Sequence, residues 1–270
     1  MRRILLFFTV LLCMASAMCA AVGEVVDSVL FIGGNVREIP AYAYRDREDI
    51  AEVRFVTPSV VTGIGDYAFI GCRNLRRIDL PSSLRSLGEG VFRECSSLRS
   101  VDLPVGIKKL PPYLFYWCEG LQNVRFPKGL TSIGRGCFGY CASLEKVDFP
   151  AGLKNIGMNA FSGCRSLREV KMPSSVTELE SYAFSDCDRL LRLTLPANGS
   201  LLGELMLSGC GNVEERYEPS RIVPKFDCES FIFEPDEGER YASVTLRVAP
   251  GMARLYRKAP GWCLFDHIIE

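Results

Sequence analysis

Apolar residues recur along this chain with a period of 23 residues. Each period closes on a cysteine, and this column is Cys72, Cys95, Cys118, Cys141, Cys164, Cys187 and Cys210. Three positions earlier stands an aromatic column that ends in a leucine: Phe69, Phe92, Phe115, Phe138, Phe161, Phe184 and Leu207. The column directly before it is small or apolar: Ala68, Val91, Leu114, Cys137, Ala160, Ala183 and Met206. Columns kept in phase over this length indicate a tandem repeat.

The common unit, xxLxxVxLPxxLxxIGxxAFxxC, predicts its own local structure. LxxVxL alternates around its central apolar residue, which is typical of a short strand. The proline that follows has no N–H to donate and ends the strand. LxxI and the frequent glycine carry the chain around a corner, and AFxxC returns it through a tight helical or 3₁₀ turn. Because one unit cannot bury its own apolar side, we expect the units to stack, with strands about 4.8 Å apart.

The repeat continues beyond its regular copies in both directions. Residues 188–210 form a degraded copy, and residues 50–72 fit if two extra residues, Val56-Thr57, separate the strand from its turn. Upstream, the core columns continue in Ile39, Ala43 and Tyr44. Arg47 occupies the position of the cysteine there, which is possible because the outermost coil has one face exposed to solvent. Eight coils at strand spacing predict a rod or arc about 40 Å long.

The recurring LPxxLxxIGxxAFxxC over residues 36–210 resembles the leucine-rich repeats of the BspA-like, or treponemal, family. The resemblance implies a right-handed curved repeat solenoid with one parallel sheet on its inner face and irregular or 3₁₀ turns outside. The tail also resembles that family's C-terminal end, a strand at Val244–Val248, a Pro250-Gly251 turn and a helix at Met252–Ala259. The anchors of that cap would be Tyr256, Trp262, Phe265 and Ile268.

These patterns divide the chain into four segments. Residues 1–21 read as a cleaved signal peptide, because two arginines precede an apolar run that is too short to span a bilayer. Residues 22–49 form an N-terminal cap and degenerate first repeat, 50–210 the leucine-rich repeats, and 211–270 an irregular coil and cap, with an exposed loop at 234–240. We expect a secreted or cell-surface protein; a periplasmic location stays open, and a lipid anchor on Cys19 is disfavoured.

Composition changes the functional picture mainly by exclusion. The 32 basic and 32 acidic residues cancel, so no overall field attracts nucleic acid or an anionic membrane.

Residues 22–35 are too few for a domain and are expected to pair onto the first coil.

Little catalytic chemistry is present. The single histidine, His267, lies four residues after Cys263 and shares a helical face with it if the tail is helical, but a nucleophile pair in a terminal cap lacks a pocket. The cysteines never cluster in zinc-ligand spacing, so we expect neither metal nor cofactor and no enzymatic activity. A column of buried thiols is favoured over disulfides between coils, Cys137 is expected to be buried too, Cys228 has no assigned partner, and the sequon at Asn198 is a weak signal.

Function is expected on the outward positions of the strands, which are polar and change from coil to coil while the core columns hold. Two columns flank the central strand residue. The ligand-binding candidates among them are Arg77, Asp79, Asp102, Asn123, Arg125, Lys146, Asp148, Glu169, Lys171 and Arg192. The alternative is that any solvent-facing strand position is polar.

An aromatic group adds two further candidates, Trp117 and Tyr140, which lie close to Tyr113 and Tyr116 in the repeat. Such a group suits an interface anchor or a glycan platform, and the alternative is local packing of the turn. The first functional hypothesis is an adhesin-like module that binds a protein or glycan, including a host extracellular protein, through its sheet face. The resemblance implies this surface adhesion. The second is a structural component of the cell envelope. The oligomeric state stays open.

Overall fold

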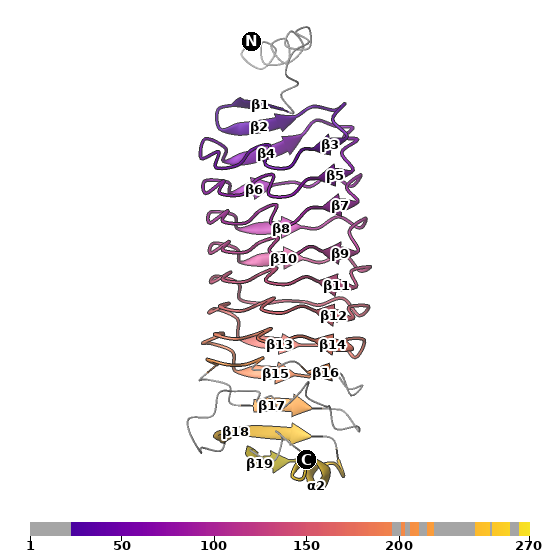
Figure 1. Ribbon diagram of the computed structural model, residues 1–270, viewed down its shortest axis with the longest axis vertical. Coiled ribbons are helices and arrows are strands. Elements are labelled where there is room, and N and C mark those ends of the chain that lie inside the picture. The colour runs from indigo at the N-terminus through magenta and orange to yellow at the C-terminus, as the bar shows by residue number, and fades with distance from the viewer. Residues whose placement is uncertain are drawn as a thin grey trace.

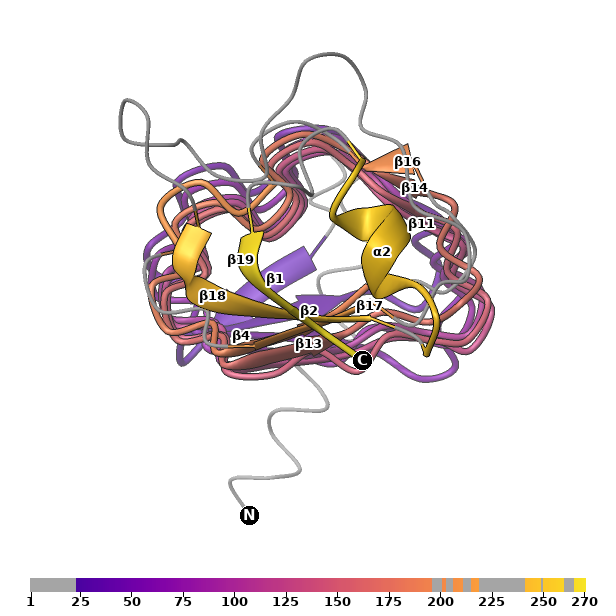
Figure 2. The same cartoon turned by 90° about the horizontal axis from the view of Figure 1, so that it is seen from below.

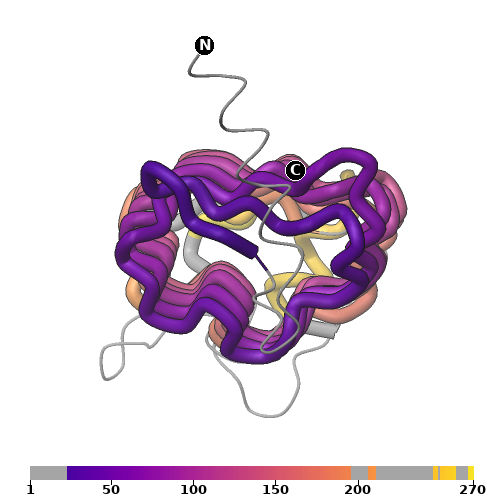
Figure 3. The backbone as a smooth tube through the Cα atoms, turned by 90° about the horizontal axis from the view of Figure 1, so that it is seen from above, coloured from indigo at the N-terminus to yellow at the C-terminus, as the bar shows by residue number. Residues whose placement is uncertain are grey.

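The computed structural model describes residues 23–195, 201–202, 206–210, 215–218, 241–248, 250–259 and 265–270. Its coils stack one above another along the longest axis of the molecule (Figure 1). Viewed along that axis, the coils superimpose on one closed outline (Figures 2 and 3). Paired residues in neighbouring regular coils are one period apart, as in Lys109 with Ser132 and Ser132 with Asn155. The predicted parallel-sheet repeat solenoid is therefore confirmed.

The LxxVxL segments form the first ladder of parallel strands. Its repeat strands are β4 (Glu52–Phe55), β6 (Arg77–Ile78), β8 (Ser100–Asp102), β10 (Asn123–Arg125), β13 (Glu169–Lys171) and β15 (Arg192–Thr194). The coil between β10 and β13 contributes a single bridge, from Lys146 to Glu169. The central strand residues point inward and are buried, as Ile78, Val101 and Val170 show.

A second ladder runs along the LxxI corner, where the pattern predicted only a turn. Its two-residue strands are β3 (Glu38–Ile39), β5 (Gly63–Ile64), β7 (Ser86–Leu87), β9 (Lys109–Leu110), β11 (Ser132–Ile133), β12 (Asn155–Ile156), β14 (Glu178–Leu179) and β16 (Leu201–Leu202). They pair in parallel down the other side of the stack in two sets, from β3 to β7 and from β9 to β16 (Figure 1). Two residues are too few for an alternating pattern to be read from sequence.

The AFxxC segments form tight turns that also bond to the next coil. The Phe115 N–H donates to the Cys137 carbonyl at 2.8 Å, whereas the Cys118 N–H donates back to the Phe115 carbonyl at 3.0 Å. The phenylalanine rings pack face to face inside these turns. The stack comprises Tyr44, Phe69, Phe92, Phe115, Phe138, Phe161 and Phe184, with centroids 5.1–5.8 Å apart.

The N-terminal end is closed by a hairpin. Strand β2 (Val29–Ile32) pairs in parallel with β4, and β1 (Gly23–Val26) pairs in antiparallel with β2. The segment at 22–35, expected to pair onto the first coil, thus contributes β2, which lies one 23-residue period before β4. Figure 3 shows the first described residues lying across the end of the stack. Ala43 was expected in the core and is exposed. The reason is that the hairpin extends the first ladder, not the turn that holds Ala43.

The C-terminal end continues the first ladder with three strands, β17 (Glu215–Glu218), β18 (Tyr241–Val248) and β19 (Phe265–Ile269). The helix α2 (Ala253–Tyr256) is shorter than predicted and covers the end of the stack with β19 (Figure 2). The predicted anchors Tyr256 and Ile268 are buried, the latter within β19. Trp262 and the loop at 234–240 lie outside the described residues.

Candidate functional site

The outward face of the first ladder holds the ten polar candidates, all with exposed side chains. They are Arg77, Asp79, Asp102, Asn123, Arg125, Lys146, Asp148, Glu169, Lys171 and Arg192. The structure thus brings together, in two parallel columns, residues that lie up to five coils apart in the sequence. We call these two columns the first-ladder face.

Opposite charges on the first-ladder face neutralise one another. Within single strands, Arg77 Nη2 lies 2.8 Å from Asp79 Oδ2, and Lys146 Nζ lies 2.8 Å from Asp148 Oδ1. Between coils, Arg125 Nη1 lies 3.2 Å from Asp102 Oδ2. Exposed pairs of this kind contribute little to stability, typically about 0–1 kcal/mol. Their main effect is to arrange alternating charge on a rigid surface.

A depression of about 520 Å³ lies at the N-terminal part of this face. Its polar side chains are Arg76, Arg77, Asp79, Ser100 and Asp102. Three of these were candidates from the sequence. Arg76 was not, because it precedes the two outward columns and only the coil geometry turns it toward them.

The aromatic candidates form a second cluster, on the AFxxC side of the coils. The rings of Trp117 and Tyr140 stack with their centroids 5.0 Å apart and their planes at 29°. Tyr116 meets Tyr140 edge-on at 5.6 Å and Tyr113 edge-on at 5.4 Å. The Arg93 guanidinium lies 5.3 Å from the centre of the Tyr116 ring.

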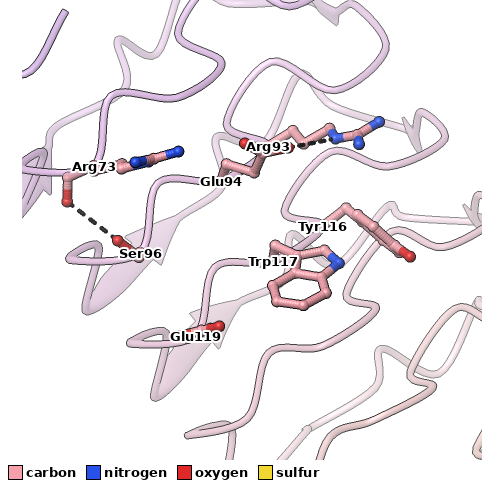
Figure 4. A pocket seen from close by; sticks show the side chains of 7 residues that line it. All are labelled: Arg73, Arg93, Glu94, Ser96, Tyr116, Trp117 and Glu119. Carbon is pink, nitrogen blue, oxygen red and sulfur yellow. Dashed lines mark hydrogen bonds and ion pairs between the residues drawn. The ribbon is translucent and has the colours of Figure 1, made fainter. Parts of the chain in front are cut away.

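An open groove of about 620 Å³ adjoins this cluster. The residues that line it are Arg73, Arg93, Glu94, Ser96, Tyr116, Trp117 and Glu119. Figure 4 shows Trp117 below Arg93 and Glu94, between the Tyr116 ring and the Glu119 side chain. Sequence reasoning found the rings but missed the charged side chains, which resemble ordinary surface residues until neighbouring coils place them together.

Trp117 and Tyr140 occupy a backbone position that favours glycine. Their φ angles are 63° and 59°, in the left-handed region. Glycine fills the same place in three other coils, at Gly71, Gly163 and Gly209, and an acidic residue with positive φ fills it in the remaining three, at Asp46, Glu94 and Asp186. Bulky side chains rarely adopt this conformation because Cβ approaches the following carbonyl oxygen. Two aromatic residues are therefore held here against the local preference of the backbone.

The cysteine column carries no reactive group. The eight described cysteines, which include Cys137, are buried thiols. Burial raises the pKa of Cys72 to about 12 and that of Cys118 beyond the usual range. A protonated, buried thiol is a poor nucleophile and a poor metal ligand.

The other suspected chemistry finds no support in the described residues. His267 is exposed in strand β19, so the helical face expected to join it to Cys263 does not form there. Cys263, Cys228, Asn198 and the leader at 1–21 lie outside the described residues. Across the part that is described, no three His, Cys, Asp or Glu side chains gather as metal ligands, and no helix is long and apolar enough to span a bilayer.

Comparison with solved structures finds other bacterial repeat proteins. A leucine rich cell surface protein from Faecalibacterium prausnitzii is 21% identical, covers 89% of this chain and 78% of its own, and has a TM-score of 0.44. The leucine rich repeat protein of T. pallidum is 26% identical over 78% of this chain and 86% of its own, with a TM-score of 0.49. No curated protein matches this chain.

The sequence model of the BspA type leucine rich repeat region matches residues 29–113 and 108–231, in 6 copies. The match covers most of the chain and extends past Cys210, in line with the strand pairing of β17. Solenoids of this repeat family typically serve as binding scaffolds, not enzymes. The chain belongs to the BspA-type leucine-rich-repeat family.

Proposed function

We propose that this chain is an exported, adhesin-like cell-surface protein whose first-ladder face binds a protein ligand. The observation that carries the proposal is the contrast between its columns: inward residues repeat in kind, whereas the exposed flanking residues change charge from coil to coil. A rigid scaffold with variable outward side chains is suited to recognition. The expected signal peptide at residues 1–21 supports export.

The pairing of charges favours a protein over a polyanion. On this face Asp79, Asp102 and Asp148 each lie within 3.2 Å of a basic group. No single sign dominates, so a partner must itself present both signs in a matching arrangement. Complementary charge of this kind increases the specificity and the association rate of binding more than it increases the affinity.

The test is binding of the chain from residue 22 onward to an array of extracellular matrix proteins, plasma proteins and glycans. One variant reverses charge on the face, with Asp79→Lys, Asp102→Lys and Asp148→Lys. A second swaps two pairs without changing net charge, with Arg77→Asp, Asp79→Arg, Asp102→Arg and Arg125→Asp. A matched control alters exposed residues beside the second ladder, with Arg85→Glu, Lys108→Glu and Lys154→Glu.

We expect a protein ligand that is lost in both face variants and retained by the second-ladder control. Loss in the swapped variant shows that the arrangement of charge, not its sum, is read. Binding that survives both face variants contradicts the proposed site. A folded protein that binds nothing on the array contradicts the adhesin and favours a structural role in the cell envelope.

A further inference from the structure

We infer that the groove beside Trp117 is a second binding site, which takes a neutral hexopyranose unit of a glycan. This inference does not depend on the first-ladder face. It starts from the two faces of the Trp117 indole, which is 41% exposed. Tyr140, in the coil below, covers one face at 5.0 Å. Arg93 and Glu94 of the coil above line the groove together with the indole (Figure 4).

A partly exposed indole that lines an open groove and is supported by a stacked ring matches the shape of a sugar ring. Pyranoses present several C–H groups on one side, and these pack against the electron-rich face of an indole. The arrangement does not suit a cationic ligand. Trp117 and Tyr140 lie against each other and do not surround a point, and the Arg93 guanidinium already lies 5.3 Å from the Tyr116 ring.

The polar rim supplies donors and acceptors in balance. Arg73 and Arg93 provide two positive groups, and Glu94 and Glu119 provide two negative ones. Arg93 Nε lies 3.2 Å from Glu94 Oε1, so part of the rim is held in place before any ligand binds. Hydroxyl groups both donate and accept hydrogen bonds, and they fit such a mixed rim. A sulfated or uronic-acid chain needs an excess of positive charge, which this groove does not have.

The size of the groove agrees with this ligand class. Its volume of about 620 Å³ falls within the range of roughly 300–1,000 Å³ that small-ligand sites occupy. The groove is open to solvent, so a longer glycan can extend beyond the unit that stacks on Trp117.

The backbone conformation at Trp117 indicates that the turn does not need this ring for its packing. At φ 63° a glycine avoids strain, and Gly71, Gly163 and Gly209 fill this place in other coils of the same fold. The turn therefore closes without an aromatic residue. A positive φ recurs at this place in every coil, and Asp46, Glu94 and Asp186 occupy it as well, so the turn does not select an aromatic side chain. Trp117 is also the most exposed ring of its cluster.

The experiment follows the fluorescence of Trp117 directly. The chain has two tryptophans, so Trp262→Phe leaves Trp117 as the single reporter. The probes are linear neutral tetrasaccharides of glucose, galactose, mannose and N-acetylglucosamine. A sulfated heparin oligosaccharide and a proline-rich decapeptide represent the other ligand classes that stack on or near aromatic residues.

Trp117→Gly removes the platform and, with glycine natural at this position in other coils, leaves a folded protein, which circular dichroism verifies. Tyr42→Gly is the matched control, because Tyr42 has a φ of 58° and stacks on Tyr67 at 5.4 Å in the first coil, away from the groove. We expect at least one neutral tetrasaccharide to shift the Trp117 emission. Because Trp117→Gly removes the reporter, affinities of the variants are compared by isothermal titration calorimetry, and the affinity is expected to fall at least tenfold in Trp117→Gly and to stay unchanged in Tyr42→Gly. It should also be unchanged by the Asp79, Asp102 and Asp148 reversals, which separates this site from the first-ladder face.

Three results would overturn the inference. One is that no neutral tetrasaccharide changes the emission of Trp117. Another is that a neutral sugar binds equally well to Trp117→Gly. The third is that only heparin or the peptide binds, since either outcome assigns the groove to a different ligand class.

Discussion

The Cys118 thiol donates a hydrogen bond to the backbone carbonyl oxygen of Phe92, one coil back, with the sulfur 2.9 Å from the oxygen. The same bond recurs down the column at 2.9–3.3 Å, with Tyr44 in place of phenylalanine for Cys72. The two columns that define the repeat are thus joined by a side-chain bond between coils. Cysteine suits this place because it is small, apolar and a weak donor.

The thiol column predicts a loss of stability in alkali. Burial raises the pKa of Cys72 from 9.0 to about 12, so the folded thiol stays protonated where the unfolded one ionises. The contribution of this thiol to stability is therefore constant below about pH 9 and falls as the pH rises toward 12. Each such thiol lowers the free energy of unfolding by about 1.4 kcal/mol per pH unit in that window. Urea unfolding at pH 8, 9, 10 and 11 measures the slope.

Cys118→Ala is the control for this slope. Removing one buried thiol makes the decline shallower by about 1.4 kcal/mol per pH unit. An unchanged slope would show that other groups, not the thiols, cause the alkaline instability.

Tyr44→Phe should stabilise the protein. The Tyr44 hydroxyl is buried and has no hydrogen-bond partner within the described chain, and burial raises its pKa to about 12. Removing an unsatisfied buried hydroxyl raises the free energy of unfolding by about 1 kcal/mol. The matched control is Tyr67→Phe, which loses a hydroxyl that donates to Glu89 and lowers stability by roughly 0.5–1 kcal/mol. Equal effects in the two variants would contradict this account.

A substitution in the phenylalanine stack should lower the free energy of unfolding much more than a substitution in the exposed aromatic cluster. Phe115 is fully buried between Phe92 and Phe138, at 5.5 and 5.3 Å. Phe115→Ala is expected to cost about 3–5 kcal/mol, because it leaves a cavity between coils. Trp117→Gly, two residues on, removes a half-exposed ring from a strained position and should cost no more than about 2 kcal/mol. Chemical denaturation of the two variants side by side tests this, and a larger loss for Trp117→Gly would assign that ring to the core.

Gly136→Ala should destabilise the chain, because Gly136 has a φ of 58° and an added Cβ would lie 2.7 Å from the Tyr113 ring. The combined strain and clash should lower the free energy of unfolding by about 1–3 kcal/mol. Gly152→Ala is the comparison, since a Cβ there meets no atom closer than 4.0 Å. Its thermal midpoint should stay within a few degrees of the parent. A similar fall in both variants would show that neither the ring nor the backbone angle is responsible.

Much of the fold could be predicted because each core column repeats the same type of apolar residue at the same place in every coil, and this repetition indicates burial. An isolated phenylalanine says little, but a phenylalanine every 23 residues beside a cysteine indicates stacked coils, and the structure stacks those rings at 5.1–5.8 Å. The exposure of the strand flanks followed from the same alternation. The exposure of Ala43 was missed because the repeat pattern describes a coil that is covered by neighbouring coils on both sides. Among the described residues, no preceding turn covers the turn of the first coil.

The sequence by itself determined the repeat, the buried columns and the family, since these depend on residue type and spacing alone. Only the tertiary structure decided which charges meet, as when Arg125 pairs with Asp102 across coils while Lys146 pairs with Asp148 within one. It also decided that Arg93 and Glu94 line the groove at Trp117, and that the corner forms a ladder. The physical reason is that the 23-residue period determines which positions are buried. Contacts between exposed side chains depend on distances between coils, which a linear pattern does not contain.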